Sequence, residues 1–261
     1  MNLTQTNYFS PEAMVHYMST SQFKAFEQCG AKALAELRGE YKTEKEAYKE
    51  GHYFEACIDG TEDLFLLQNP DMTSSKGATK GELKSNFKRV QGAVDAFRAQ
   101  PMFVDIVAKC QSQVIVSGVI AGIKFKGCVD FYDPETGESF DTKCMKDFKK
   151  IYSESEGRYL QWYFAYGYHY QAAIYQELIR QTFGKVGKPH IIAVTKEEIP
   201  DVMAMEFSSE IIGNALEIVE EFAPLYDQIK KGIEEPEACG KCDYCKQNKV
   251  VSGFETVLEY E

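Results

Sequence analysis

Hydrophobic residues in the first hundred positions recur with the period of a helix. Phe23 and Phe26 share one face of a segment predicted to be helical over residues 20–37, and either Thr20 or Ser21 can cap its start. The segment also contains a cysteine, and a glycine follows its end. Further helices of this kind are predicted over residues 45–57 and 82–99.

The pattern changes at residue 113. β-branched and aromatic residues stand there in short runs, separated by Gly118, Gly122 and a turn over residues 133–137. This predicts an antiparallel meander of three or four strands that ends near Lys143. The rest of the chain predicts a long helix over 159–181 packed on the sheet, strands over 190–195 and 202–207, and a closing helix over 211–230.

The order of these elements predicts an α/β (α+β) fold in which helices flank a mixed central sheet. No linker or repeat interrupts the sequence, so we expect a single domain over residues 1–261. Its expected parts are an N-terminal helix over 17–38, a core over 43–235 and a cysteine-containing tail over 236–261.

Charge restricts what the protein can bind. Lys and Arg number 29 against 40 Asp and Glu, which gives a net charge of −11, so contact with a polyanion must be local. The first ten residues do not resemble a signal peptide, and the uncharged run over 159–176 is too polar for a bilayer span. We therefore expect a cytoplasmic protein that does not contact membranes.

Two carboxylates lie on either side of the turn in the predicted meander. Asp130 ends one strand and Asp141 lies in the next, so a hairpin would bring them together as oxygen ligands for Mg²⁺. Lys143 shares a face with Asp141, which would put an ammonium beside the metal, where it can orient a water molecule. Thr142 is expected to point away, with its carbonyl oxygen available as a ligand.

Three of the eight cysteines form a second candidate site. Cys239, Cys242 and Cys245 have C-x-x-C-x-x-C spacing, which lets thiolates converge on one metal centre. A fourth ligand is needed to complete it. Four thiolates would suit either an iron–sulfur cluster or Zn²⁺.

The acidic residue, hairpin and D-x-K of Asp130, Asp141 and Lys143 resemble the PD-(D/E)XK nuclease superfamily. This resemblance implies a restriction-endonuclease-like core in which these residues, with the Thr142 carbonyl, bind Mg²⁺ or Mn²⁺ and cleave DNA.

Two further segments resemble the RecB-type members of this superfamily. Residues 51–56 resemble their first motif, which implies that Glu55 is a metal ligand and His52 a neighbouring polar group. Residues 171–175 resemble their Q-x-x-x-Y motif. The resemblance implies that Gln171 reaches the active site to hold DNA or the catalytic lysine, and that Tyr175 has a weaker role of the same kind.

The fourth cluster ligand also follows from this resemblance. In iron–sulfur RecB-type nucleases, one cysteine in a segment similar to residues 21–29 joins three C-terminal cysteines, so Cys29 is implied to complete the set with Cys239, Cys242 and Cys245. The group implies a [4Fe-4S] cluster, with Zn²⁺ as the alternative. Such a centre would hold the two ends of the chain together.

Residues 17–249 are similar to phage-type exonucleases of the exodeoxyribonuclease VIII kind. This implies a phage- or prophage-encoded homo-oligomer that digests linear double-stranded DNA from 5′ ends and leaves 3′ tails for a single-strand annealing recombinase. We expect the DNA to follow the lysine-rich stretches 143–150, which includes Lys146, and 241–249.

Other functions are compatible with the same residues. One is a non-catalytic DNA-binding or scaffold subunit that recruits the annealing protein. Others are a zinc-dependent structural module with an accidental D-x-K, and an iron–sulfur nuclease of CRISPR adaptation.

Overall fold

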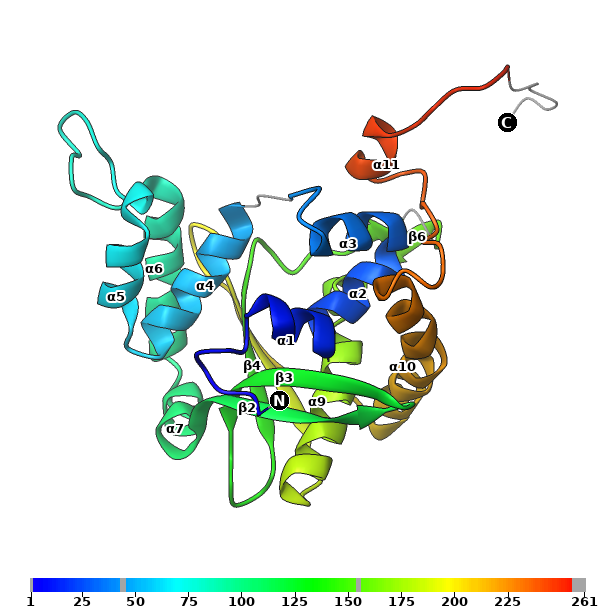
Figure 1. Ribbon diagram of the computed structural model, residues 1–261. Helices are drawn as coiled ribbons and strands as arrows, with labels where there is room; N and C mark the ends of the chain where they lie inside the picture. The colour runs from blue at the N-terminus through cyan, green and yellow to red at the C-terminus, as the bar shows by residue number, and fades with distance from the viewer. Residues whose placement is uncertain (1, 43–45, 154–155, 255–261) are drawn as a thin grey trace.

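A computed structural model describes residues 2–42, 46–153 and 156–254, and a mixed sheet lies at its centre (Figure 1). Its strands run in the order β1-β3-β4-β7-β8, and β2 pairs with β3 off this path. The strands of this sheet are β1 (Met18–Ser19), β2 (Gln111–Ile120), β3 (Ile123–Tyr132), β4 (Ser139–Met145), β7 (Pro189–Thr195) and β8 (Val202–Glu206). A separate hairpin consists of β5 (Ile151–Ser153) and β6 (Arg158–Leu160).

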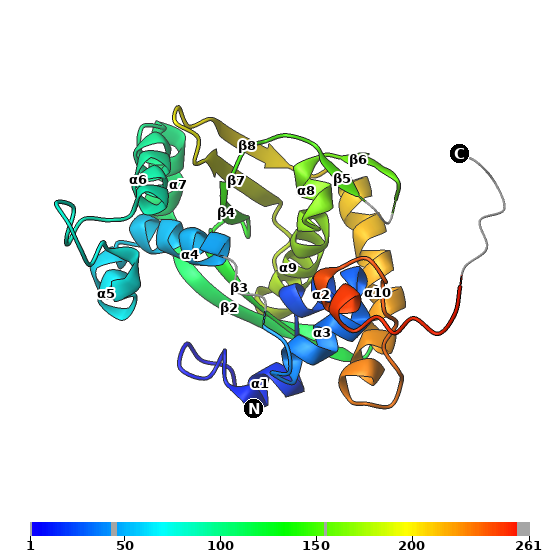
Figure 2. The same ribbon diagram turned by 90° about the horizontal axis from the view of Figure 1, so that it is seen from above.

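Helices cover both faces of the sheet (Figure 2). One face carries α4, α6 and α7, and the other carries α9 and α10 with the N-terminal α2 and α3. The helices are α1 (Pro11–His16), α2 (Thr20–Gln28), α3 (Gly30–Leu37), α4 (Glu46–Ile58), α5 (Glu62–Gln68), the 3₁₀ turn η1 (Pro70–Met72), α6 (Ser85–Arg98), α7 (Pro101–Lys109), α8 (Trp162–Ala165), α9 (Tyr168–Phe183), α10 (Ser209–Lys230) and α11 (Asp243–Gln247). This confirms the predicted α/β class.

The inner strand β7 shows why the two faces need different helices. Ile192 and Val194 pack into the cluster with α4, α6 and α7, whereas Ile191 and Ala193 pack into the cluster with α9 and α10. Successive side chains of a strand point to opposite faces, so a strand covered on both sides is apolar at nearly every position.

The predicted meander is confirmed as β2, β3 and β4. β2 and β3 pair over almost their whole length, but the β3–β4 ladder is limited to Phe131 with Phe140 and Tyr132 with Ser139. On its other side β4 pairs in parallel with β7 along its whole length. Strands β3 and β4 therefore separate next to Asp130, and the candidate carboxylates lie at this opening.

The helix predicted over residues 20–37 is in fact two helices. Cys29 is extended, with φ −168° and ψ 103°, and separates α2 from α3. The N-cap is also one residue earlier than expected: Ser19 accepts from the Gln22 N–H at 3.2 Å, and the Gln22 side chain accepts from the Ser19 N–H at 3.1 Å. The hydrophobic period continues across Cys29, so it gave no sign of the break.

The long helix predicted from residue 159 begins later. Residues 158–160 form β6, and Gly167 separates α8 from α9 with φ 64°. A left-handed conformation suits glycine, and it ends the helical path although the surrounding tyrosines keep helical spacing. The strands near 190–195 and 202–207 and the final helix agree with the prediction within a few residues.

The N-terminal helix α3 and the C-terminal tail meet. The Ala31 N–H donates to the Glu237 carbonyl at 3.0 Å, and α11 lies against α3 in both views (Figures 1 and 2). Within the described ranges, every helix falls short of the length and apolar character that crossing a bilayer requires.

Candidate functional site

Asp130 bridges the opening between β3 and β4. Its Oδ2 accepts from the Thr142 N–H at 2.8 Å and from the Thr142 hydroxyl at 3.1 Å. The expectation that the Thr142 side chain points away is therefore wrong, because its hydroxyl holds the Asp130 carboxylate. These bonds replace the ladder contacts that β3 and β4 lack at this position.

Asp141 and Lys143 lie one pleat apart on β4 and form a largely buried ion pair. The other oxygen of Asp141, Oδ1, accepts from the Gln171 amide of α9 at 2.6 Å. The Lys143 ammonium also lies 5.2 Å from the centre of the Tyr168 ring. The D-x-K pair and the glutamine of the Q-x-x-x-Y motif therefore meet in one site, as the resemblance implied.

Glu55 faces this site from α4. Burial raises its pKa to about 7, the Lys143 charge opposes this shift, and the Asp141 charge adds to it. His52 lies one helical turn earlier, and burial followed by the charge of Lys143 lowers its pKa. The structure thus brings Glu55 within electrostatic reach of the D-x-K pair and leaves His52 as its neighbour.

The three carboxylates of Glu55, Asp130 and Asp141 together carry more negative charge than the Lys143 ammonium neutralises. Burial, then the charge of Asp141, raises the Asp130 pKa well above its ordinary value. Burial alone would lower the pKa of Lys143, but the carboxylates of Asp141 and Asp130 outweigh burial and raise it. Three carboxylates around one ammonium form a site that favours an additional cation.

The spacing of ligand atoms differs between the two candidate sites. Among the described residues, the four cysteines bring their ligand atoms within 4.8 Å of one another, and the three carboxylates do not form such a group. Asp130 is held by Thr142, and Asp141 is held by Lys143 and Gln171. The donor set fits a hard divalent cation, but these contacts hold the oxygens apart.

Sequence reasoning missed Lys24, which reaches the site from α2. Its Nζ lies 3.5 Å from Gln171 Oε1 and 5.0 Å from the centre of the Tyr168 ring. Burial lowers its pKa to about 8, and the nearby Lys143 charge adds to that effect. No motif marks Lys24, because only tertiary packing brings α2 to the site.

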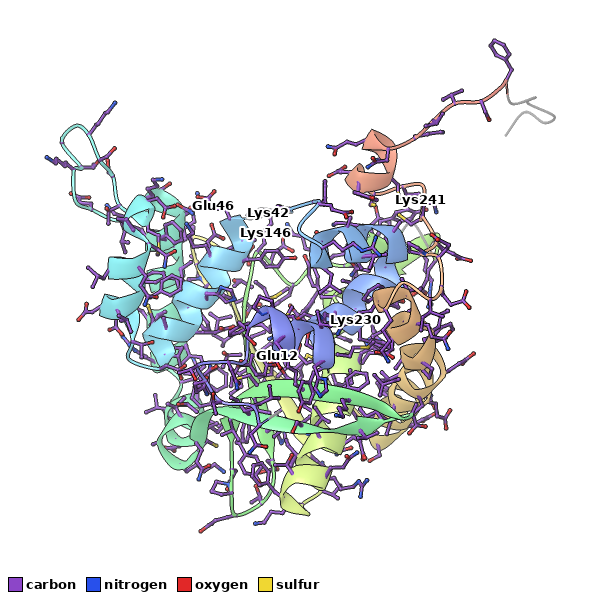
Figure 3. The ribbon with its side chains drawn as sticks, viewed as in Figure 1. Glu12, Lys42, Glu46, Lys146, Lys230 and Lys241 are labelled. Carbon is purple, nitrogen blue, oxygen red and sulfur yellow. The ribbon has the colours of Figure 1, made fainter. Side chains whose placement is uncertain are left out.

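The two remaining expected DNA contacts differ in exposure. Tyr175 is buried, and its hydroxyl donates to the Cys128 carbonyl of β3 at 3.0 Å. This position makes it a packing residue beside Asp130. Lys146 is exposed just after β4, on the same side of the molecule as Lys42 and Lys241 (Figure 3).

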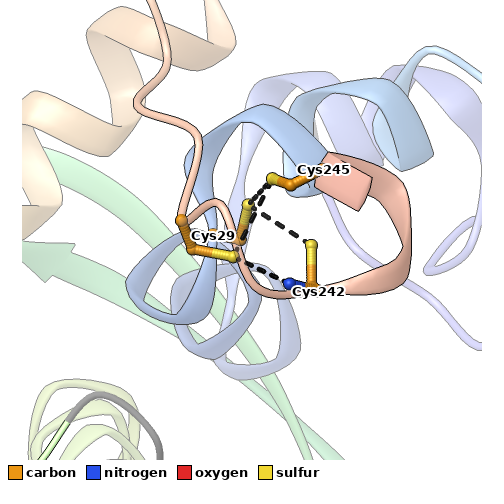
Figure 4. A group of neighbouring side chains, drawn as sticks. Cys29, Cys242 and Cys245 are labelled. Atoms are coloured by element: carbon orange, nitrogen blue, oxygen red, sulfur yellow. Dashed lines mark hydrogen bonds between the residues drawn. The ribbon is translucent and has the colours of Figure 1, made fainter. Parts of the chain in front are cut away.

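The structure brings Cys29 together with Cys239, Cys242 and Cys245 (Figure 4). The Sγ–Sγ distances are 3.5 Å from Cys29 to Cys245, 3.8 Å from Cys239 to Cys245, and 3.8 Å from Cys242 to Cys29. The extended backbone at Cys29 places its thiol between the ends of the chain. The break between α2 and α3 thus belongs to this centre.

The backbone of the tail also favours a thiolate. The Cys242 N–H donates to Cys239 Sγ at 3.3 Å. Burial would raise the pKa of Cys239, but the N–H groups of Lys241 and Cys242 lower it to about 6. Thiolates are the form that binds metals, so these N–H groups favour Cys239 as a metal ligand.

Comparison with known proteins gives the same picture. Residues 19–248 match the family described as a PDDEXK-like domain of unknown function (DUF3799). A crystal structure of a provisionally assigned exonuclease from Eubacterium rectale is 31% identical, covers 98% of this chain and 97% of that chain, and has a TM-score of 0.87. A second solved structure, SSO0001, is 13% identical over 87% of this chain and 96% of that chain, with a TM-score of 0.31, which is too low to show a common fold. No curated protein matches the chain.

Proposed function

Because the chain belongs to the family of PDDEXK-like domains, we propose that it is a metal-dependent nuclease that hydrolyses phosphodiester bonds of DNA. The supporting observation is the site itself. Asp130, Asp141 and Lys143 meet where β3 and β4 separate, and Glu55 and Gln171 complete their surroundings. A purely structural ion pair would not need three carboxylates around one ammonium, and two of these carboxylates, Asp130 and Asp141, are buried.

Glu55, Asp130, Asp141 and the Thr142 carbonyl are the proposed ligands of Mg²⁺ or Mn²⁺. When bound, such a cation lowers the pKa of a water molecule and neutralises phosphate charge. Lys143 orients the attacking water and stabilises the charge that develops on the phosphate oxygens. Gln171 holds Asp141 in position. Attack in line on phosphorus breaks the bond to the 3′ oxygen and leaves a 5′-phosphate on the product.

The proposed substrate is the end of linear double-stranded DNA. Support comes from the 31% identity with the provisionally assigned exonuclease, over nearly the full length of both chains. The proposal also includes digestion from the 5′ end, 3′ tails for an annealing recombinase and a homo-oligomeric assembly. These parts rest on the resemblance. Lys146, exposed beside the site, is a proposed DNA contact.

The test compares linear and circular duplex DNA with the parent protein and Asp130→Asn. The parent should digest only the linear form, and only with Mg²⁺ or Mn²⁺, while Asp130→Asn should be slower by roughly a hundredfold or more. Asp105→Asn, an exposed aspartate on α7, is the matched control and should digest as the parent does. DNA binding without cleavage by the parent would instead favour the scaffold function.

We also propose that the four cysteines hold a single Zn²⁺ ion. A Zn²⁺ ion bound by four thiolates at about 2.3 Å would place their sulfurs about 3.8 Å apart at the corners of a tetrahedron. Three of the six Sγ–Sγ separations are 3.5 to 3.8 Å, and all four sulfurs lie within 4.8 Å of one another, which supports this geometry. In a [4Fe-4S] cluster each thiolate binds a different iron, so the sulfurs lie further apart.

Metal content distinguishes the two centres. Protein purified without oxygen should contain about one zinc per chain, remain colourless and lose zinc in Cys29→Ser. Cys57→Ser, which replaces a buried cysteine outside the centre, should retain it. About four irons per chain and a brown colour would show that the centre is an iron–sulfur cluster.

A further inference from the structure

A cavity of about 810 Å³ lies beside the candidate active site. Its walls come from α2, the β5–β6 hairpin, the junction of α8 and α9, and the tail that carries Cys239 and Cys242. Lys24 lines the cavity and also lies 3.5 Å from Gln171, which in turn donates to Asp141. The cavity therefore adjoins the residues to which we assign cleavage.

The walls are more basic than the protein as a whole. They contain Lys24, Lys150, Arg158 and Lys241, against the two carboxylates of Glu27 and Glu156. Among the described wall residues four cations stand against two acids, whereas the whole chain has a net charge of −11, so the sign of the charge is locally reversed. Such a reversal is what contact with a phosphate backbone requires of an acidic protein.

Aromatic rings accompany these cations. Tyr152 on β5 and Tyr159 on β6 are 52% and 67% exposed, although large rings usually bury most of their surface. Their ring centres lie 5.3 Å apart in an edge-to-face arrangement. Phe164 and Tyr170 line the same cavity. Exposed rings between basic side chains can stack on the bases of a single strand.

We propose that this cavity binds one strand of DNA, with bases stacked on Tyr152 and Tyr159 and phosphates near Lys150 and near Arg158, whose guanidinium is also paired with Glu156. The proposal rests on the nuclease function above and adds the path of one strand next to the scissile bond. A volume of about 810 Å³ lies within the range of roughly 300–1,000 Å³ in which proteins enclose small ligands. A cavity of this size can hold a few nucleotides of one strand.

The test measures binding of a fluorescein-labelled 12-nucleotide oligothymidine to the full chain by fluorescence anisotropy, without divalent metal. Tyr152→Ala and Tyr159→Ala should each weaken binding by roughly fivefold or more, because each removes a stacking ring. Tyr159→Phe keeps the ring and should bind as the parent does. Tyr48→Ala removes a tyrosine of α4 that is 60% exposed, and it should leave the affinity unchanged.

Equal affinity of the parent, Tyr152→Ala and Tyr159→Ala would overturn the proposal, as would the absence of oligonucleotide binding by the parent. Duplex digestion, measured in parallel, separates this failure from failure of the nuclease function. If the parent digests duplex DNA and the tyrosine variants bind the oligonucleotide normally, the nuclease function is supported and the cavity site is wrong. If the parent binds the oligonucleotide through these tyrosines but cleaves no DNA, the cavity site is supported and the nuclease function is wrong.

Discussion

At the residue scale, the candidate site is a balance of buried charges. Burial and mutual repulsion raise the pKa values of Asp130 and Glu55, and one ammonium, that of Lys143, lies among them. Gln171 connects this group to Lys24, since its amide nitrogen donates to Asp141 while its oxygen lies 3.5 Å from the Lys24 ammonium. Gln171 thus sets the orientation of a carboxylate without carrying charge itself.

Replacing Gln171 tests this positioning role. Gln171→Leu should lower the affinity for Mg²⁺ or the rate of cleavage by roughly 10- to 100-fold, because Asp141 loses the contact that orients it. Cleavage measured against Mg²⁺ concentration gives the result. Gln176→Leu on the same helix is the control, since that amide donates to the Gly187 carbonyl away from the site. Equal losses in both variants would mean that Gln171 acts only through helix packing.

His169 gives a pH prediction outside the proposed metal ligands. Burial, then the Lys24 charge, lowers its pKa to about 4. Between pH 6.5 and 4 the imidazole takes up a proton in the unfolded chain but not in the folded one, so its contribution to stability, present above pH 6.5, is lost as the pH falls. Urea unfolding at pH 7 and pH 5 should show a smaller loss for His169→Gln than for the parent. The exposed His16→Gln is the control, and a loss in His169→Gln as large as in the parent would contradict the assignment.

At the element scale, two single residues decide where helices stop. Hydrophobic spacing predicted the helical character of residues 20–37 and most of 159–181, but it missed the breaks at Cys29 and Gly167. Spacing reports which face of a helix is apolar, whereas a break depends on the φ of one residue. Both breaks serve the sites, since Cys29 enters the cysteine centre and Gly167 packs against Lys24.

Gly167 and Gly39 form a matched pair of positive-φ glycines. A Cβ on Gly167 would lie 2.9 Å from Lys24 Cδ, whereas a Cβ on Gly39 would meet no atom within 4 Å. Gly39→Ala should therefore cost about 1 kcal/mol of stability from the left-handed backbone alone. Gly167→Ala should cost more and should also slow DNA cleavage, because Lys24 must move. Denaturant unfolding and a cleavage assay on both variants test this, and identical behaviour would contradict it.

At the scale of the whole molecule, the cysteine centre joins segments more than 200 residues apart. Cys239, Cys242 and Cys245 of the tail converge on Cys29 near the start. A metal that binds only the folded chain stabilises it by its binding free energy, and it also restrains the two ends.

Loss of this centre should lower the melting temperature. Cys245→Ser removes a buried ligand and should reduce Tm by roughly 5 °C or more. The parent treated with a strong chelator should fall by a similar amount. Cys110→Ser, a half-buried cysteine outside the centre, should melt close to the parent. Unchanged melting of Cys245→Ser would mean that the centre does not contribute to stability.

The order of elements and the D-x-K hairpin could be predicted from sequence because both depend on local patterns. The meander and its turn bring Asp130 and Asp141 to one place through a single hairpin. The contribution of Lys24 could not be predicted in this way, because α2 is far from β4 in sequence and reaches it only by packing on α9 and β3. The cavity beside Lys24 depends in addition on the β5–β6 hairpin, but residues 159–160 of β6 were predicted to begin the long helix and no strand was predicted at β5.

Cleavage of duplex DNA labelled at its 5′ or 3′ ends, with the parent and Lys143→Ala side by side, tests the central claim most directly. With Mg²⁺ the parent should release the 5′ label and leave a lengthening 3′ tail, and Lys143→Ala should be slower by roughly a hundredfold or more. Lys80→Ala, an exposed lysine, should match the parent. Equal cleavage by the parent and Lys143→Ala, or no cleavage by metal-replete parent protein, would contradict the assignment of this site as the catalytic centre of a nuclease.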